Sequence, residues 1–373
     1  MGTTGQSPTS IDTSADTSRQ EVRFVSGGQE CVAWLYTAHD ARTPGPMVVM
    51  GHGLGAVRQM RLDAFAERFA AAGWSVLVFD YRYLGASGGQ PRQLIDIGAQ
   101  LADWHAALAY ARSLPFVDTQ RIAVWGSSFG GGHVLQVAAA DGRVAAVVAQ
   151  CPFTDGPAST LARLRAGVPS MLILGGAALL DTVGSWFGAR PVLMPMAGPS
   201  WLPGFLVSPD TVSGASQLVP AGTLLSARTS AALRRLPRLR AQLAPHLELS
   251  GNLSPAEPGI GRDSLWGVLT GPRGSFTAAN ALSARLALRL PFYRPGRAMV
   301  RIQAPTLVCV CDHDAVAPAA ATIAHAADAA HVHIRTYPCA HFDIYVGTHF
   351  EQAVRDQILF LAEQFGDTAA AHH

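Results

Sequence analysis

The segment Ile122–Gly130, IAVWGSSFG, joins a short apolar run to a glycine-rich stretch that continues as a helical pattern to Ala140. A buried strand, the pattern G-x-S-x-G and a helix together are typical of a nucleophile elbow, a sharp turn that presents a serine hydroxyl. Ser128 has glycine at both ±2 positions, whereas Ser127 does not. The segment therefore predicts a nucleophile at Ser128, with the Phe129 N–H at the helix start as a donor to a developing oxyanion.

Strand and helix patterns alternate outward from this segment. The expected strands are 21–26, 30–37, 47–50, 75–79, 145–149, 305–311 and 332–337, and the expected helices are 97–111, 317–329 and 350–365. Such alternation is typical of βαβ units, so we expect an α/β fold with a mostly parallel central sheet that is flanked by helices.

The alternation breaks after Pro152 and resumes near Ala304. A long structureless loop is improbable inside a compact domain, so we expect a large inserted, mainly helical cap. The resulting division is a disordered tail at 1–20, core at 21–155, cap or lid at 156–296, core at 297–366 and a disordered tail at 367–373.

Two apolar stretches of the insertion have predicted roles. Ala166–Leu180 is too short to span a bilayer comfortably, so we interpret it as a buried or lid helix. Arg190–Pro209 carries no charge after its first residue and is interpreted as pocket wall or lid. The substrate-binding candidates here are Trp186, Trp201 and Phe205.

A second glycine-rich loop, Gly51–Gly55 (GHGLG), follows the expected strand 47–50. Its Leu54 N–H is predicted to complete an oxyanion hole with the Phe129 N–H. His52 and, farther on, Tyr83 are further substrate-binding candidates. The loop also fits a dinucleotide fingerprint with Asp80 as ribose ligand, but that alternative leaves the serine motif unexplained.

A serine nucleophile needs a histidine base and a carboxylate that orients it. Asp312 and Asp314 follow the strand 305–311, and Asp314 is favoured because the turn after it leaves its carboxylate free to point across the sheet end. His341 follows the strand 332–337 and is the predicted base. The order Ser, Asp, His along the chain supports a triad of Ser128, Asp314 and His341.

With these motifs the sequence resembles the α/β-hydrolase superfamily, near the dienelactone hydrolases and Xaa-Pro peptidase-like esterases. The resemblance covers residues 23–155 and 296–366 and rests on Gly51–Gly55, Asp80–Gly88, Gly126–Gly130, Asp314 and His341–Tyr345. Tyr83 stands where the D-x-R-G-x-G-x-S loop of the family usually has its first glycine. A serine at the elbow speaks against dienelactone-hydrolase chemistry proper. The substrate class does not carry over, because the resemblance omits the middle third.

Composition limits the remaining choices. The chain has 373 residues, is 49% apolar and 14% charged, and has a net charge of +2. Its basic cluster at 234–240 has no aromatic interleaving, so we expect no nucleic-acid partner and no stable membrane insertion. Five scattered cysteines predict no disulfide framework and favour a cytoplasmic location. The oligomeric state stays open, with a homodimer among the alternatives.

The predicted function is that of a serine carboxylic-ester hydrolase, acting on an ester, thioester or lactone with a hydrophobic portion through an acyl-serine intermediate. We expect no cofactor and no metal. The alternatives are an acyltransferase, a small-peptide or amide hydrolase with the same triad, and a catalytically silent binding protein on the same fold.

Overall fold

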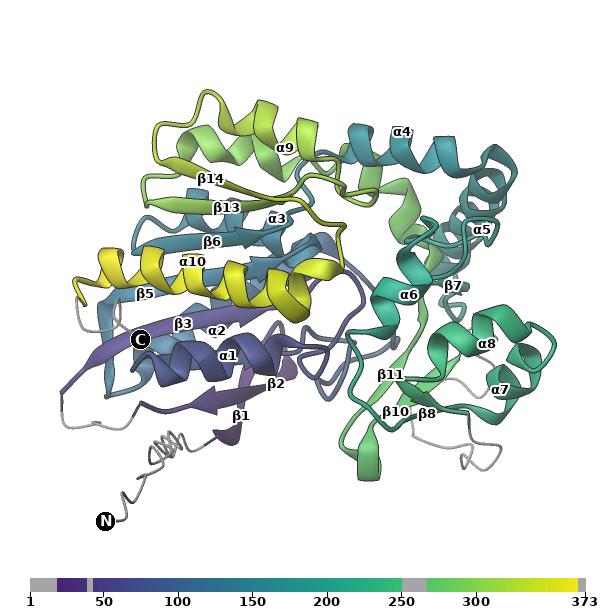
Figure 1. Ribbon diagram of the computed structural model, residues 1–373, viewed down its shortest axis with the longest axis horizontal. Helices are drawn as coiled ribbons and strands as arrows, with labels where there is room; N and C mark the ends of the chain where they lie inside the picture. Colours follow the sequence, from purple (N-terminus) through teal and green to yellow (C-terminus); the bar gives the residue numbers. More distant parts are fainter. Residues whose placement is uncertain (1–18, 39–42, 250–266, 368–373) are drawn as a thin grey trace, which may run out of the picture.

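The computed structural model describes residues 19–38, 43–249 and 267–367, and its core is an eight-stranded mixed sheet with helices on both faces (Figure 1). Both predicted tails fall almost entirely outside these residues. The strands run in the order β1-β2-β4-β3-β5-β6-β13-β14. Their bounds are β1 Arg19–Ser26, β2 Gln29–Tyr36, β3 Gly45–Gly51, β4 Ser75–Phe79, β5 Val117–Ser127, β6 Ala146–Gln150, β13 Thr306–Cys311 and β14 Val332–Tyr337.

Only the first two pairings of this sheet are antiparallel. β1 pairs with β2 as a hairpin and β2 pairs with β4, while every later neighbour is parallel. The inner strands β4, β6 and β13 are buried at every residue, as expected where helices cover both faces. The predicted fold class, a mostly parallel sheet flanked by helices, is confirmed.

The core helices form two layers. α1 (Leu62–Ala71) and α10 (Gly347–Phe365) pack on one face of the sheet, and α2 (Ile97–Ser113), α3 (Phe129–Ala140) and α9 (Ala319–Ala326) pack on the other. Asp96 caps α2 by accepting the Ala99 N–H at 2.8 Å. The parallel strands therefore end together at one uncovered edge of the sheet, where the following loops meet.

The segment between β6 and β13 lies beyond this edge, to the right in Figure 1. It was expected to be mainly helical, but it also holds a two-stranded and a four-stranded sheet. The helices are α4 Gly156–Ala166, α5 Val168–Trp186, α6 Thr211–Ser216, α7 Ala227–Leu233 and α8 Pro237–Leu243. The strands are β7 Leu193–Pro195, β8 Thr223–Leu225, β9 Leu247–Glu248, β10 Val268–Thr270, β11 Thr277–Ala279 and β12 Ala281–Ser283. Strands of two or three residues are too short to show alternation in the sequence.

Five short 3-10 helices complete the described elements. They are η1 Pro272–Gly274, η2 Ala284–Leu288, η3 Leu290–Phe292, η4 Pro295–Arg301 and η5 Asp343–Tyr345. η2 packs on α5 and η3 packs on α4, so the second half of the insertion returns to the core beside its first two helices.

The sequence predicted a buried or lid helix at 166–180, and the buried alternative is wrong. α5 begins at Val168 and ends at Trp186, and it buries only one side, including Leu174 and Ala178. Its outward side is apolar as well, with Leu172 71% exposed. Within the described residues, α5 is the one helix that is long and apolar enough to cross a membrane by length and composition.

A buried ion pair fixes the loop that follows β4. Asp80 is fully buried and accepts hydrogen bonds from the Arg58 backbone at 2.8 Å, the Arg58 guanidinium at 2.7 Å and the Ala86 N–H at 3.0 Å. Arg58 in turn lies between Asp80 and Glu21 of β1. The pair therefore links the hairpin, the segment before α1 and the loop after β4.

Replacing Asp80 should destabilise the fold strongly. In Asp80→Ala the buried Arg58 guanidinium loses its fully buried carboxylate partner and keeps the partly exposed Glu21, so we expect the free energy of unfolding to fall by about 3–5 kcal/mol. Urea denaturation followed by circular dichroism measures this. The control is Asp118→Ala, which removes a partly exposed pair with Arg121 and should change stability by less than about 1 kcal/mol. Equal losses in both variants would contradict the assigned role of the buried pair.

Candidate active site

Ser128 sits in a strained turn between β5 and α3. Its φ and ψ are 55° and −117°, outside the regions that L-residues ordinarily adopt. The neighbouring glycines make the turn possible, because a Cβ on Gly126 would collide with the backbone of Gly130, and one on Gly130 would lie 2.5 Å from the His52 carbonyl oxygen. The structure thus shows the predicted strand, turn and helix around Ser128.

The loop Gly51–Gly55 lies directly against this turn. A Cβ on Gly53 would stand 3.0 Å from the Ser128 Cβ, closer than ordinary van der Waals contact, so the glycine eases this close approach. Leu54, the next residue, lines the same cavity as Ser128. Phe129 is the first residue of α3, where backbone N–H groups have no partner within the helix. The two residues predicted to supply oxyanion donors therefore lie near the serine, Leu54 in the loop after β3 and Phe129 at the start of α3.

His341 connects Ser128 to Asp314. Its Nε2 lies 3.0 Å from the Ser128 Oγ, and its Nδ1 lies 2.6 Å from an Asp314 carboxylate oxygen. The other Asp314 oxygen accepts the N–H groups of Val316 and Ala317 at 2.8 and 2.6 Å, which fixes the carboxylate. The structure brings the three predicted residues together.

The two residues weighed against these lie differently. Asp312 is exposed, while Asp314 points to the histidine. Ser127 is fully buried on the opposite side of the turn, where its hydroxyl bonds the Tyr345 hydroxyl and accepts from the Gln150 amide at 3.3 Å. Ser127 is therefore held in the core, and only Ser128 faces the cavity.

The charge environment of His341 favours the imidazolium. Burial of the ring lowers its pKa, but the negative charges of Asp314 and Cys151 and the hydrogen bond that the ring donates to Asp314 outweigh burial and raise the pKa to about 9. An imidazole this close to a serine hydroxyl and a carboxylate can accept the serine proton and be stabilised in its charged form.

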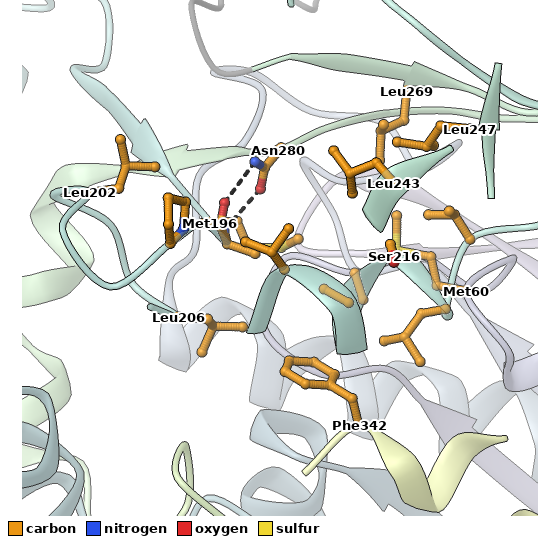
Figure 2. A pocket seen from close by; sticks show the side chains of 18 of the residues that line it. Met60, Met196, Leu202, Leu206, Ser216, Leu243, Leu247, Leu269, Asn280 and Phe342 are labelled. Atoms are coloured by element: carbon orange, nitrogen blue, oxygen red, sulfur yellow. Dashed lines mark hydrogen bonds between the residues drawn. The ribbon is translucent and has the colours of Figure 1, made fainter. Parts of the chain in front are cut away.

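An apolar cavity of about 280 Å³ opens from Ser128 and His341 into the inserted segment. Figure 2 shows side chains from the core and from the insertion pointing into it, with Phe342 at one side and Leu243 and Leu269 at another. The apolar lining residues of the insertion include Leu206, Val212, Leu218, Val219, Leu225, Leu233, Leu236, Leu239, Leu243, Leu247 and Leu269. Such a lining suits a hydrocarbon portion of a ligand better than a charged one.

Asn280 shapes one wall of this cavity. Its side-chain amide accepts the Ala197 N–H at 2.9 Å and donates to the Ala197 carbonyl at 2.8 Å, which are the dashed lines in Figure 2. These two hydrogen bonds to the backbone connect the segment after β7 to the turn between β11 and β12. No motif in the sequence pointed to Asn280, whereas Tyr345 lay in the His341–Tyr345 motif without an assigned role.

Of the predicted substrate-binding residues, only Trp201 lines the cavity. His52 is fully buried with its ring against Tyr81, and Phe205 is buried away from the lining. Tyr83 has a positive φ and packs beside Gly89. Trp186 is 74% exposed at the end of α5. These four side chains point elsewhere because the loop packing, not their type, sets their direction.

The dinucleotide alternative is not supported by the geometry around Asp80. The Asp80 carboxylate is buried and engaged by Arg58 and the Ala86 N–H, so it is not presented to a ribose. Nor does the loop Gly51–Gly55 leave room for a pyrophosphate, because it packs against the elbow glycines.

The sheet order, the serine turn at the end of β5 and the loop after β3 define an α/β hydrolase. Residues 42–180 match the family model described as serine aminopeptidase, S33. The quorum-quenching protein AidA of Acinetobacter baumannii is 44% identical over 341 residues, which cover 91% of this chain and 93% of that protein. The chain belongs to the α/β-hydrolase family that includes this relative, and the predicted superfamily is confirmed.

More distant similarities are narrower. A thiohydrolase of Eupenicillium brefeldianum is 39% identical over 137 residues, 36% of this chain and 44% of that protein. The crystal structure of the α/β hydrolase GrgF from Penicillium sp. sh18 superposes with a TM-score of 0.65 at 22% identity, covering 94% of this chain and 99% of that one. The latter supports the fold alone.

The pKa of His341 generates a test of the triad geometry. A general base must be neutral, so kcat/KM should rise with pH and level off only above the ordinary histidine range, near pH 9. In Asp314→Asn the charge that raises the pKa is gone, so the acid limb should move to lower pH and the plateau should fall by about 10⁴-fold.

Ester hydrolysis followed across pH 5 to 10 measures both effects. Asp312→Asn is the matched control, since Asp312 is exposed, and should keep the wild-type profile. An unchanged acid limb in Asp314→Asn would show that Asp314 does not set the protonation of His341.

Proposed function

We propose that this protein is a serine hydrolase that cleaves a carboxylic ester, thioester or lactone through an acyl-serine intermediate. The observation that carries the proposal is the continuous contact from Asp314 through His341 to the Ser128 hydroxyl at the inner end of an apolar cavity.

The chemistry follows from these contacts. The Ser128 Oγ attacks the acyl carbonyl while His341 Nε2 accepts its proton, and His341 then donates that proton to the leaving oxygen or sulfur. Asp314 holds the ring by its Nδ1 and stabilises the imidazolium. The Leu54 and Phe129 N–H groups stabilise the oxyanion, and removing one such donor typically costs about 100- to 1000-fold in rate. Water then attacks the acyl-serine with His341 as base.

The shape of the cavity supports a substrate with an apolar chain. Leucine, valine and methionine make up about half of the residues that line the cavity. Each methylene that leaves water contributes about 0.8 kcal/mol to binding, so chain length should matter. Two relatives are a quorum-quenching protein and a thiohydrolase, which supports a signalling molecule and a thioester among the candidate substrates. We propose a small signalling molecule with an acyl bond as the substrate class.

Peptidase action is a weaker candidate, although the matched family model is named for aminopeptidases. An aminopeptidase needs an acid that holds the substrate amine, and no carboxylate lines the cavity within the described ranges. Asp181 is bound by Arg285 and Ser283, and Asp210 accepts the Ser208 hydroxyl. The cavity is therefore better suited to an uncharged substrate.

Acyl transfer is the second candidate for the same acyl-serine intermediate. A relative named polyketide transferase from Penicillium sp. is 36% identical over 138 residues, which supports it for part of the chain. The two outcomes separate when an alcohol or thiol is added to the assay, because a transferase forms a new ester with it and a hydrolase releases the free acid.

We further propose a cytoplasmic location. All five cysteines are buried and free, which suits a reducing compartment.

A chain-length series tests the proposal. The value of kcat/KM for p-nitrophenyl esters should rise from acetyl toward decanoyl, by up to about fourfold per methylene until the cavity is full. Leu243→Trp, which fills part of the cavity on the side opposite Phe342, should lower kcat/KM for the decanoyl ester and leave the acetyl ester unchanged. Ser128→Ala should be inactive on all esters.

An equal loss for acetyl and decanoyl esters in Leu243→Trp would argue against a chain-binding cavity. Activity in Ser128→Ala would overturn the mechanism itself, and the two failures are distinguishable.

A further inference from the structure

α5 presents an apolar face to solvent. Helix residues that share its outward side are all without charge, although a surface helix normally places polar residues there. The face consists of Leu172 (71% exposed), Ile173 (56%), Leu179 (59%), Leu180 (68%), Val183 (37%), Trp186 (74%) and the following Phe187 (82%). Nineteen helical residues extend over about 28 Å, so the face is long as well as apolar. A contiguous exposed apolar patch of this kind marks an interaction surface.

Elements beside α5 also expose apolar side chains. α4 packs on α5 and carries Leu161, which is 53% exposed, and η3 packs on α4 and carries Phe292, which is 84% exposed.

The charged residues in the segments around this face are mostly positive. The segments 156–209 and 284–294 contain six arginines, at 163, 165, 190, 285, 289 and 294, and a single acid, Asp181. Asp181 is buried and paired with Arg285, and Arg294 is paired with Asp155 just before the first segment, whereas Arg190 and Arg289 are exposed. An apolar helix face with aromatic side chains at one end and cations beside it matches the interface of an anionic bilayer.

We propose that the α5 face docks this protein peripherally on membranes that contain anionic phospholipid. The exposed leucines enter the acyl-chain boundary, Trp186 and Phe187 lie at headgroup depth, and Arg190 and Arg289 meet the phosphates. A spanning orientation does not fit, because the inward side of α5 is packed on η2 and holds the Asp181–Arg285 pair. A second copy fits less well, because two such faces would bring arginines together without exposed carboxylates between them.

The docking surface is linked to the cavity. Ser170 at the start of α5 donates to the Leu202 carbonyl at 2.8 Å, and Leu202 and the exposed Trp201 both line the cavity. The rim of the cavity is thus hydrogen-bonded to the N-terminal end of α5. If the proposed function holds, apolar substrates dissolved in the bilayer would enter near this rim, but the docking itself does not depend on that function.

Vesicle flotation without substrate tests the docking. The full chain should float with vesicles of phosphatidylglycerol and phosphatidylcholine, bind pure phosphatidylcholine more weakly, and lose the difference at high salt. The double variant Leu172→Glu/Leu180→Glu should reduce partitioning by about tenfold or more, because it places two charges on the face. Leu359→Glu on α10, an exposed leucine far along the chain, is the control and should partition like wild type.

Several outcomes would overturn the proposal. One is that the wild-type protein does not float with vesicles, and another is that the double variant floats as well as the wild type. A third is that the wild type does not bind vesicles and the double variant differs from it only in being a monomer instead of a dimer in analytical ultracentrifugation. Matching thermal unfolding curves and matching hydrolysis of a soluble short ester show that both variants are folded. Loss of ester hydrolysis in every protein would instead count against the proposed function.

Discussion

The backbone of Ser128 is the constraint on which the rest of the site depends. A residue held at a φ of 55° and a ψ of −117° costs on the order of 1–3 kcal/mol, and it persists only because its surroundings leave no alternative. Those surroundings are specific, since the Gly126 and Gly130 backbones touch and the Gly130 backbone touches the loop at His52. The same contacts that hold the serine therefore place the Leu54 loop beside it.

A series of hydrogen bonds between buried polar side chains supports the turn at Ser128. The Trp125 indole donates to Gln357 at 2.9 Å, Gln357 donates to Gln150 at 2.8 Å, and Gln150 donates to Ser127 at 3.3 Å. Ser127 then bonds Tyr345, which also lines the cavity. This series joins β5, β6, α10 and η5, so the elbow is braced by elements from both ends of the sequence. It also explains why two adjacent serines have different surroundings.

The core and the triad geometry could be predicted from the sequence because their signals are local. The G-x-S-x-G motif lies between a strand and a helix within one short segment, and Asp314 and His341 each follow a continuous strand pattern at the sheet edge where such residues meet. The fold class could therefore be predicted from the alternation of strand and helix patterns and from the spacing of the glycines around Ser128. The structure brings the three side chains together, and their catalytic roles stay predictions.

The inserted segment could not be predicted in the same way. β9 has two residues and β7 has three, so neither is long enough to show the alternation of apolar and polar residues that identifies a strand in the sequence. Apolar side chains of 190–209 were expected to form a pocket wall or lid, and Met196, Trp201 and Leu206 do line the cavity. Phe205 of the same stretch is buried outside that lining. An apolar stretch does not by itself say whether it faces a core, a cavity or solvent, and for α5 the outward side is solvent-exposed.

Labelling with a fluorophosphonate probe followed by peptide mass spectrometry tests the central claim most directly, because the probe reacts only with an activated serine. If Ser128 is the activated nucleophile, the probe should modify Ser128 and not Ser127 in the wild-type chain, and His341→Ala should lose the labelling. Labelling of Ser127 or of a serine outside the elbow, or an unlabelled wild type, would contradict it.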